Sequence, residues 1–389
     1  MRREARSEEM KVMPVEEQDE IDDQDLPACS LTLIVPCYNE ELTLAHCIER
    51  VLRLKSNKID LEIIIVDDCS KDQSLKVAHE LALDHPEVRV LHHEVNRGKG
   101  AALRTGFAHA AGDFVGVQDA DLEYEPLEYR KLLVPLLEKK ADVVFGSRYL
   151  RPGTRRTLYF WHSWMNKTLT FLSNMMTNLD ISDMETCYKL FRRDVIQSMD
   201  LKEERFGIEP EMVSKVAQMR CRVYECAISY NPRTYEEGKK IGWKDGLRAL
   251  YCILHYSANT APLPMQLLLY LLIGGTSAVC NITFFSILFN LGVGLTPAVV
   301  VSFAGAALVN YLLCISLLFR HKARWATGGE IIAYLATLGI MGAFDAGVTL
   351  GLVAIGMPPL MGKSLATLLG FVGNFLLRKY LVFPEKGIV

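Results

Sequence analysis

The 389-residue chain lacks an excess of either charge, with 43 Lys and Arg against 46 Asp and Glu. This balance excludes a strongly basic nucleic-acid-binding protein. Its ten cysteines include no CxxC pair, so we expect free thiols in a reducing compartment rather than zinc ligands. The N-terminus lacks an apolar signal region, and residues 1–28 hold ten acidic and four basic residues, which predicts an acidic disordered tail.

The chain also lacks the motifs of several enzyme classes. No GxGxxG follows a first strand, and the nearest candidate, from Gly98 to Gly100, has the wrong spacing. No Ser-His-Asp order is evident, and the nine histidines form no metal-binding box. The sequence therefore gives little support to a dehydrogenase, a triad hydrolase or a histidine metal site.

What the chain does have is an apolar C-terminal third. Each of four apolar runs is about 24 residues long, roughly 36 Å as a helix, which is enough to cross a hydrocarbon core of about 30 Å. The expected spans are 267–290, 295–319, 331–356 and 360–383. Residues 266–389 carry seven basic and three acidic residues, and the basic ones gather after the second and fourth runs. The positive-inside rule then predicts a multi-pass protein of the cell membrane, with residues 1–265 in the cytoplasm.

An internal repeat with an offset of 64 residues runs through this third. Its matches include Tyr270 with Tyr334, Gly292 with Gly356, Asn281 with Asp345, and the run from Asn310 with the run from Asn374. Each unit is predicted to be a helical hairpin, and the two hairpins to run parallel. Asp345 is a candidate functional group because an ionisable residue is costly in mid-span, and Asn281 is its polar counterpart in the first unit. The alternative for Asp345 is a hydrogen bond that packs helices together.

Residues 31–146 alternate between short β-branched apolar runs and amphipathic stretches. The runs predict strands at 31–36, 61–66, 88–91, 113–117 and 142–146, and the stretches predict helices at 41–54, 73–84, 99–110 and 127–139. This alternation is typical of an α/β domain with a mainly parallel sheet and helices on both faces. Such sheets bind ligands beyond the carboxyl ends of their strands.

Acidic residues follow two of these strands. Asp67 and Asp68 follow the second, and Asp119 and Asp121 follow the fourth. In isolation they could be helix N-caps or turn residues. Two carboxylates at i and i+2 can also converge on one hard cation, Mg²⁺ or Mn²⁺, which takes oxygen ligands and often a substrate diphosphate.

Five motifs, in order along the chain, resemble those of the family 2 glycosyltransferases with the GT-A fold. They are Val35-Pro36-Cys37-Tyr38-Asn39-Glu40, Val66-Asp67-Asp68-Cys69-Ser70, Asn96-Arg97-Gly98-Lys99-Gly100, Asp119-Ala120-Asp121 and Gly146-Ser147-Arg148-Tyr149. The two-hairpin unit resembles the GtrA-like membrane domain. Together they resemble polyprenyl-phosphate hexosyltransferases of the dolichol-phosphate mannose synthase type.

The resemblance implies roles for named residues. Those expected at the nucleotide sugar are Pro36, Tyr38, Glu40, Asp67, Asp68, Lys99, Asp119, Arg233 and Lys239. Those expected at the metal are Asp119, Asp121 and Glu123, the last at a position where relatives often have glutamine. Those expected at the acceptor phosphate are Ser147, Arg148, Arg151 and Lys240, and the catalytic set is Asp119, Asp121, Asp183 and Arg148.

The implied reaction is inverting transfer of mannose or glucose from GDP-mannose or UDP-glucose to dolichyl or undecaprenyl phosphate on the cytoplasmic face, aided by Mg²⁺ or Mn²⁺. The predicted domains are the tail, a transferase domain at 29–242, an interfacial helix and linker at 243–265, and a membrane domain at 266–389. One alternative is a lipid-linked sugar flippase or scaffold with a vestigial transferase domain. Another is a processive synthase, but no tryptophan lies in a QxxRW motif. A homo-oligomer is left open.

Overall fold

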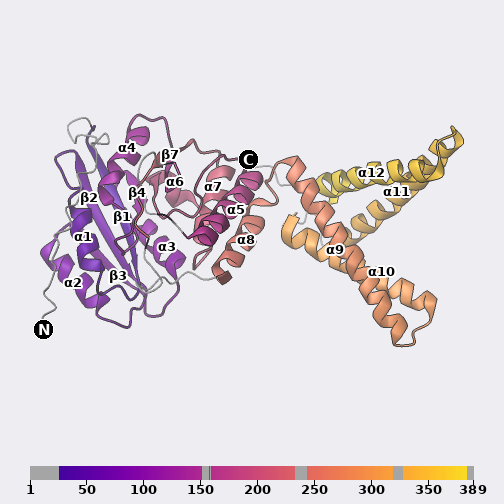
Figure 1. Cartoon of the computed structure of the whole chain (residues 1–389), viewed down its shortest axis with the longest axis horizontal. Helices are drawn as coiled ribbons and strands as arrows, with labels where there is room; N and C mark the ends of the chain where they lie inside the picture. The colour runs from indigo at the N-terminus through magenta and orange to yellow at the C-terminus, as the bar shows by residue number, and fades with distance from the viewer. Residues whose placement is uncertain (1–25, 151–156, 158, 233–242, 319–326, 383–389) are drawn as a thin grey trace, which may run out of the picture.

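The computed structural model describes residues 26–150, 157, 159–232, 243–318 and 327–382 (Figure 1). An α/β domain forms the N-terminal part of the chain, and a purely helical domain forms the C-terminal part. The predicted tail, residues 1–28, lies almost entirely outside the described residues.

A seven-stranded mixed sheet forms the centre of the α/β domain. Its strands are β1 (Cys29–Cys37), β2 (Ile59–Asp67), β3 (Val88–His92), β4 (Phe114–Val117), β5 (Val143–Ser147), β6 (Lys189–Arg192) and β7 (Val223–Ala227), in the order β3-β2-β1-β4-β6-β5-β7. β1 pairs in parallel with β2 and β4, and β5 pairs in parallel with β7. β6 is antiparallel to both of its neighbours, β4 and β5. Leu33, Ile34 and Val35 are fully buried, as expected for a strand covered on both faces.

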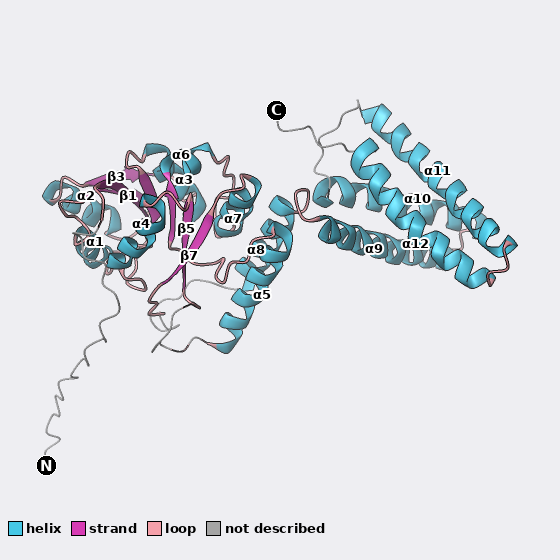
Figure 2. Ribbon diagram, turned by 90° about the horizontal axis from the view of Figure 1, so that it is seen from above, coloured by secondary structure: helices cyan, strands magenta, loops and turns pink. Residues whose placement is uncertain are grey.

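Helices cover both faces of this sheet (Figure 2). The helices of this domain are α1 (Leu44–Leu52), α2 (Ser74–Asp84), α3 (Lys99–His109), η2 (Pro126–Glu128), α4 (Tyr129–Leu137), α5 (Phe160–Thr177), α6 (Arg193–Ser198), α7 (Ile208–Gln218) and α8 (Trp243–Ser257). Of these, α5, α7 and α8 pack mainly against one another beside the sheet. The predicted α/β fold is confirmed, and each of the five predicted strands is present within about two residues. The antiparallel β6 and the edge strand β7 were not predicted, and they make the sheet mixed.

The boundaries of the C-terminal helices confirm the predicted 64-residue repeat. The first hairpin consists of α9 (Leu263–Asn290), α10 (Leu295–Leu313) and the π-helix η3 (Cys314–Leu318); the second consists of α11 (Thr327–Ala354), α12 (Pro359–Leu377) and the π-helix η4 (Arg378–Val382). Every boundary in the second hairpin is 64 residues after its counterpart in the first. Gly292 and Gly356, with φ of 82° and 93°, turn the two hairpins at equivalent positions.

Polar side chains join the two hairpins across a pseudo-twofold axis. The Asn374 amide donates to the Tyr270 hydroxyl over 2.9 Å, and the Tyr334 hydroxyl donates to Asn310 over 3.3 Å. Tyr334 is 64 residues after Tyr270, and Asn374 is 64 residues after Asn310, so each bond is the repeat equivalent of the other. Arg378 lies buried between the same tyrosines and donates to Asn310 over 2.7 Å. Cys314, the repeat equivalent of Arg378, lies 3.8 Å from its guanidinium nitrogen.

Two polar candidates were predicted in the membrane domain. Asn281 is partly buried on α9, and the side chain of Asp345 on α11 lies outside the described side chains. Within the described part of the chain, α9 is the helix that is both long and apolar enough to cross a membrane by length and composition. The number of spans therefore stays a prediction.

Candidate active site

The loops after β1 and β2 are fastened to each other at the carboxyl edge of the sheet. The Asn39 amide donates to the Ser70 hydroxyl over 3.0 Å, and the Lys71 amide donates to the Asn39 side-chain oxygen over 2.8 Å. Asn39 adopts a left-handed conformation, with φ of 54°, which its short polar side chain tolerates. These bonds hold Tyr38 and Glu40 over the sheet edge, where both line a cavity.

Asp68 organises the loop that begins α3. Its carboxylate accepts from the backbone amides of Arg97 and Gly98, over 2.9 and 2.6 Å, and pairs with His93 over 2.7 Å. Gly98 has a φ of 96°, and a Cβ there would lie 2.4 Å from the Glu204 carbonyl oxygen. Only glycine fits this position, and the resulting turn directs the next residue, Lys99, into the cavity.

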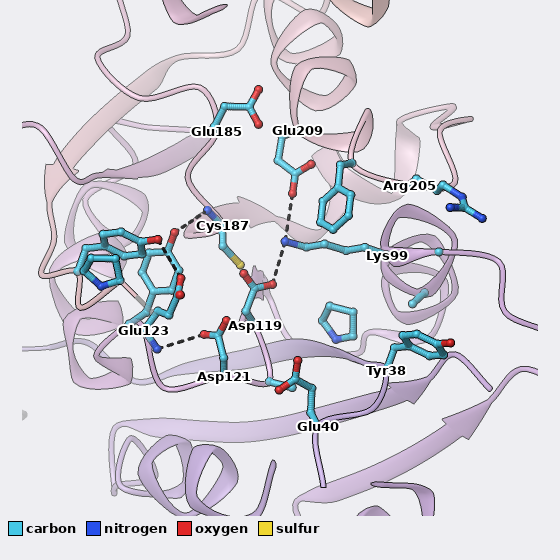
Figure 3. A pocket seen from close by; sticks show the side chains of 18 of the residues that line it. Tyr38, Glu40, Lys99, Asp119, Asp121, Glu123, Glu185, Cys187, Arg205 and Glu209 are labelled. Carbon is cyan, nitrogen blue, oxygen red and sulfur yellow. Dashed lines mark hydrogen bonds and ion pairs between the residues drawn. The ribbon is translucent and has the colours of Figure 1, made fainter. Parts of the chain in front are cut away.

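Lys99 joins two carboxylates at the centre of the cavity (Figure 3). Its ammonium nitrogen lies 2.8 Å from Asp119 and 3.1 Å from Glu209. Burial opposes the charge on Lys99, but Asp119 and Glu209 outweigh burial and raise the pKa of Lys99 well above its usual range. The amine therefore stays charged and neutralises part of the acidic cluster.

The predicted metal ligands Asp119, Asp121 and Glu123 all line this cavity. Glu123 accepts a hydrogen bond from the Tyr230 hydroxyl over 2.9 Å, and its backbone amide donates to Asp121 over 3.1 Å. Among the described residues, no three His, Cys, Asp or Glu side chains are gathered as a complete protein metal site. Mg²⁺ commonly needs only one or two carboxylates when a substrate diphosphate supplies the other oxygens, and this donor set fits that arrangement.

Arg148 provides the cationic side of the cavity. Asp183 accepts two bonds of 2.7 Å from its guanidinium and a third, of 3.1 Å, from its backbone amide. Burial opposes the charge on Arg148, but Asp183 outweighs it and raises the pKa of Arg148 well above its usual range. Asp183 is fully buried and does not line the cavity, so it positions Arg148 rather than meeting a ligand itself.

The structure brings most of the predicted site residues into one cavity of about 430 Å³. The predicted residues that line it are Pro36, Tyr38, Glu40, Asp68, Lys99, Asp119, Asp121, Glu123 and Arg148. Asp67 and Ser147 are fully buried and do not line the cavity. Asp67 instead accepts hydrogen bonds from the Ser70 backbone amide and the His92 ring, and the Ser147 hydroxyl is hydrogen-bonded to the Ser182 hydroxyl. Arg151, Arg233, Lys239 and Lys240 lie outside the described residues.

The cavity also contains residues that lie outside the predicted set of site residues. They include Glu185, Arg205, Glu209 and Tyr230, together with Tyr159, His162, Ser163 and Asn166 from the beginning of α5. The segment around Glu209 carried a faint signal, since Glu209 and Glu211 alternate in the first turn of a helix. Glu185 lies two residues after Asp183, which belongs to the predicted site, and long-range packing brings the remaining residues into the cavity.

Family models match both domains. Residues 32–199 match the model described as glycosyl transferase family 2, and residues 269–383 match the model described as the GtrA/DPMS transmembrane domain. The sheet, the strand-end carboxylates and these matches define the class: the protein is a glycosyltransferase attached to a membrane domain. More particularly, it combines a family 2 glycosyltransferase domain with a GtrA/DPMS transmembrane domain, and it is a membrane protein.

Three curated proteins illustrate the likeness. A dolichol-phosphate mannosyltransferase of Pyrococcus furiosus is 25% identical over 72% of this chain and 78% of its own. A dolichyl-phosphate beta-glucosyltransferase of Trichomonas vaginalis is 29% identical over 52% of this chain and 65% of its own. An undecaprenyl-phosphate 4-deoxy-4-formamido-L-arabinose transferase of Proteus mirabilis is 31% identical over 54% of this chain and 62% of its own. The chain thus spans less than two thirds of the last two relatives.

Among solved structures, glucosyl-3-phosphoglycerate synthase of Mycobacterium tuberculosis resembles part of the chain. Its complex with Mn²⁺, UDP and glucosyl-3-phosphoglycerate superposes with a TM-score of 0.47 at 19% identity. The similarity covers 60% of this chain and 81% of the synthase.

Proposed function

We propose that the protein transfers a hexosyl group, mannose or glucose, from a nucleoside diphosphate sugar to a polyprenyl phosphate. The observation that carries the proposal is one cavity lined by both acidic and cationic side chains. Tyr38, Glu40 and Asp68 line it with polar and acidic groups from the loops at the sheet edge, and Lys99 and Arg148 add cationic groups. The names of the relatives, which include mannosyl and glucosyl transferases acting on dolichyl phosphate, agree with this chemistry.

Helix α5 supports a lipid acceptor because it touches both the cavity and the exterior. His162, Ser163 and Asn166 on this helix line the cavity. Apolar side chains on the same helix and on its neighbour α8 are exposed instead, and we call them the aromatic surface: Phe160, Trp161, Trp164, Phe171, Leu247 and Tyr251. Aromatic groups of this kind suit the boundary between water and lipid. A lipid held there would have its phosphate near Arg148.

In the proposed reaction, an oxygen of the lipid phosphate attacks C1 of the sugar as the nucleoside diphosphate leaves, with inversion at C1. The acceptor is already anionic near neutral pH, so the protein need not remove a proton from it. Arg148, fixed by Asp183, would orient the acceptor phosphate through bidentate hydrogen bonds. Lys99 would favour the anionic leaving group.

A divalent cation, Mg²⁺ or Mn²⁺, is part of the proposal. Asp121, with Asp119 or Glu123, would hold it together with the substrate diphosphate. When bound, it would neutralise charge on the departing diphosphate. Lys99 already occupies one oxygen of Asp119, so Asp121 would be the principal protein ligand.

The direct test incubates the purified full-length protein with labelled GDP-mannose or UDP-glucose, polyprenyl phosphate and Mg²⁺ or Mn²⁺. We expect a lipid-linked sugar from at least one donor, and nearly complete loss of transfer in Asp121→Ala. Glu138→Gln is a matched control, because Glu138 is an exposed carboxylate outside the cavity. Donor hydrolysis without a lipid product, or full activity in Asp121→Ala, would contradict the proposal.

A further inference from the structure

Two carboxyl groups lie on the side of Lys99 away from Tyr38 and Glu40 (Figure 3). Glu209 is 5% exposed in the first turn of α7, and Glu185 lies in the segment before β6. One oxygen of Glu209 pairs with Lys99 over 3.1 Å. The other oxygen of Glu209 and one oxygen of Glu185 are buried without a hydrogen-bond donor in the described part of the chain.

We expect a bound ligand to supply hydrogen-bond donors to these two oxygens. A buried carboxylate oxygen without a partner costs free energy, and native proteins keep few of them. Burial and the nearby charge of Glu209 raise the pKa of Glu185 to about 7, as expected where two carboxyl groups share too few donors. Both residues line the cavity, so their carboxyl groups border the space that a ligand would fill.

We propose that Glu185 and Glu209 accept hydrogen bonds from hydroxyl groups of the transferred sugar and thereby select which hexose is transferred. This inference rests on the proposed function. The diphosphate and the lipid phosphate are anionic, so two carboxylates would repel them. The hexosyl group is the neutral, hydroxyl-rich part of the substrates, and carboxylates serve as acceptors for its hydroxyls.

Glu211 offers a control within the same helix. It lies two residues after Glu209 and is fully buried, but it does not line the cavity. Its oxygens accept from the backbone amides of Lys202, over 2.9 and 3.0 Å, and Glu203, over 2.7 Å. Glu211→Gln therefore removes a buried charge from the same turn without touching the proposed sugar contact.

The experiment measures dissociation constants with the full-length protein in detergent. The probes are GDP-mannose, GDP-glucose, UDP-glucose and UDP-galactose, together with GDP and UDP alone. Hydrogen bonds to a charged group contribute about 1.5–3 kcal/mol, so we expect Glu209→Gln and Glu185→Gln to weaken binding of the preferred nucleotide sugar by roughly 10- to 150-fold. We expect binding of the nucleoside diphosphate to change by less than about threefold. The preference between epimeric sugars should shrink.

Each control result has a stated meaning. Glu211→Gln should lower the thermal unfolding midpoint and leave both sugar affinity and epimer preference unchanged. If the glutamine variants weaken GDP or UDP by the same factor as the nucleotide sugar, their effect is structural and the inference is wrong. If the glutamine variants keep full affinity for nucleotide sugar and full epimer preference while the wild type binds and transfers a sugar, the inference is wrong and the proposed function is unaffected. If the wild type binds no nucleotide sugar at all, the proposed function fails and the inference with it.

Discussion

The buried pair of Arg148 and Asp183 allows a quantitative test of how the cavity is built. The Asp183 side chain is fully buried and that of Arg148 is 10% exposed, so neither charge is well solvated. Removing one partner of such a pair costs about 3–5 kcal/mol, because the other charge is left buried and uncompensated. Replacing both partners by apolar residues is often nearly neutral. We therefore expect Asp183→Leu and Arg148→Met each to be strongly destabilising, and the double variant to lose much less than the sum.

Thermal unfolding of the full-length protein in detergent, followed by tryptophan fluorescence, measures this coupling. For a domain of this size, we expect each single substitution to lower the unfolding midpoint by on the order of 10 °C. The double variant should recover several degrees of that loss. Sugar transfer should remain low in all three variants, because none of them presents a fixed guanidinium to the acceptor phosphate. Unfolding measurements together with transfer assays therefore distinguish the effect of the Arg148–Asp183 pair on stability from its effect on sugar transfer.

Two results would refute the reasoning. If the two single losses add fully in the double variant, Arg148 and Asp183 are not energetically coupled. If Asp183→Leu keeps normal transfer, Arg148 does not need Asp183 to hold it. Lys140→Met is a suitable control, because Lys140 pairs with Glu138 at the exposed surface, where ion pairs contribute little.

Three further predictions follow from other features. Gly98→Ala should destabilise the protein by roughly 1–3 kcal/mol and weaken binding of nucleotide sugar, because the alanine Cβ would collide with the Glu204 carbonyl oxygen and φ at this position is positive. Thermal unfolding and binding measurements test this prediction, and an unchanged unfolding midpoint would contradict it. Burial and Glu209 raise the pKa of Glu185 from 4.5 to about 7, so the folded state holds this proton more tightly than the unfolded state does. The contribution of Glu185 is therefore favourable at low pH and is lost as pH rises from about 4.5 to about 7, and Glu185→Gln should flatten this part of the stability profile. The double variant Trp161→Ser/Trp164→Ser should lower transfer to polyprenyl phosphate in vesicles severalfold and leave binding of GDP or UDP unchanged, since both side chains are exposed on the aromatic surface; equal losses in both assays would indicate misfolding instead.

Local patterns in the sequence were enough to predict the first five of the seven strands. The strands and helices between residues 29 and 147 alternate, and the strands are rich in β-branched and other apolar residues, so the pattern marks them clearly. β6 has only four residues and begins with the buried Lys189, whose amine donates to the backbone carbonyl of Met184 over 2.8 Å. A lysine at the start of a short run argues against a buried strand, and its satisfied backbone contacts cannot be seen in the sequence.

The site was predictable where side chains follow strands directly and hidden where they reach it by long-range packing. Tyr38, Asp68 and Asp119 follow strands and line the cavity. Asp183 was expected in the catalytic set from the family resemblance, and its carboxylate accepts two hydrogen bonds from the Arg148 guanidinium. Glu185 lies only two residues after Asp183, but its unpaired oxygen is visible only in three dimensions.

The repeat in the membrane domain is broken at one buried position, where one hairpin carries a cation and the other a neutral residue. Cys314 and Arg378 occupy equivalent positions of the two hairpins and contact each other near the pseudo-twofold axis. In a symmetric dimer of identical hairpins both positions would hold the same residue, and two guanidinium groups about 4 Å apart would repel by roughly 4 kcal/mol. Joining the hairpins in one polypeptide breaks that symmetry, so one copy carries the cation and the other a small neutral thiol. Covalent duplication thereby permits a single buried charge on an axis where a homodimer must place either two or none.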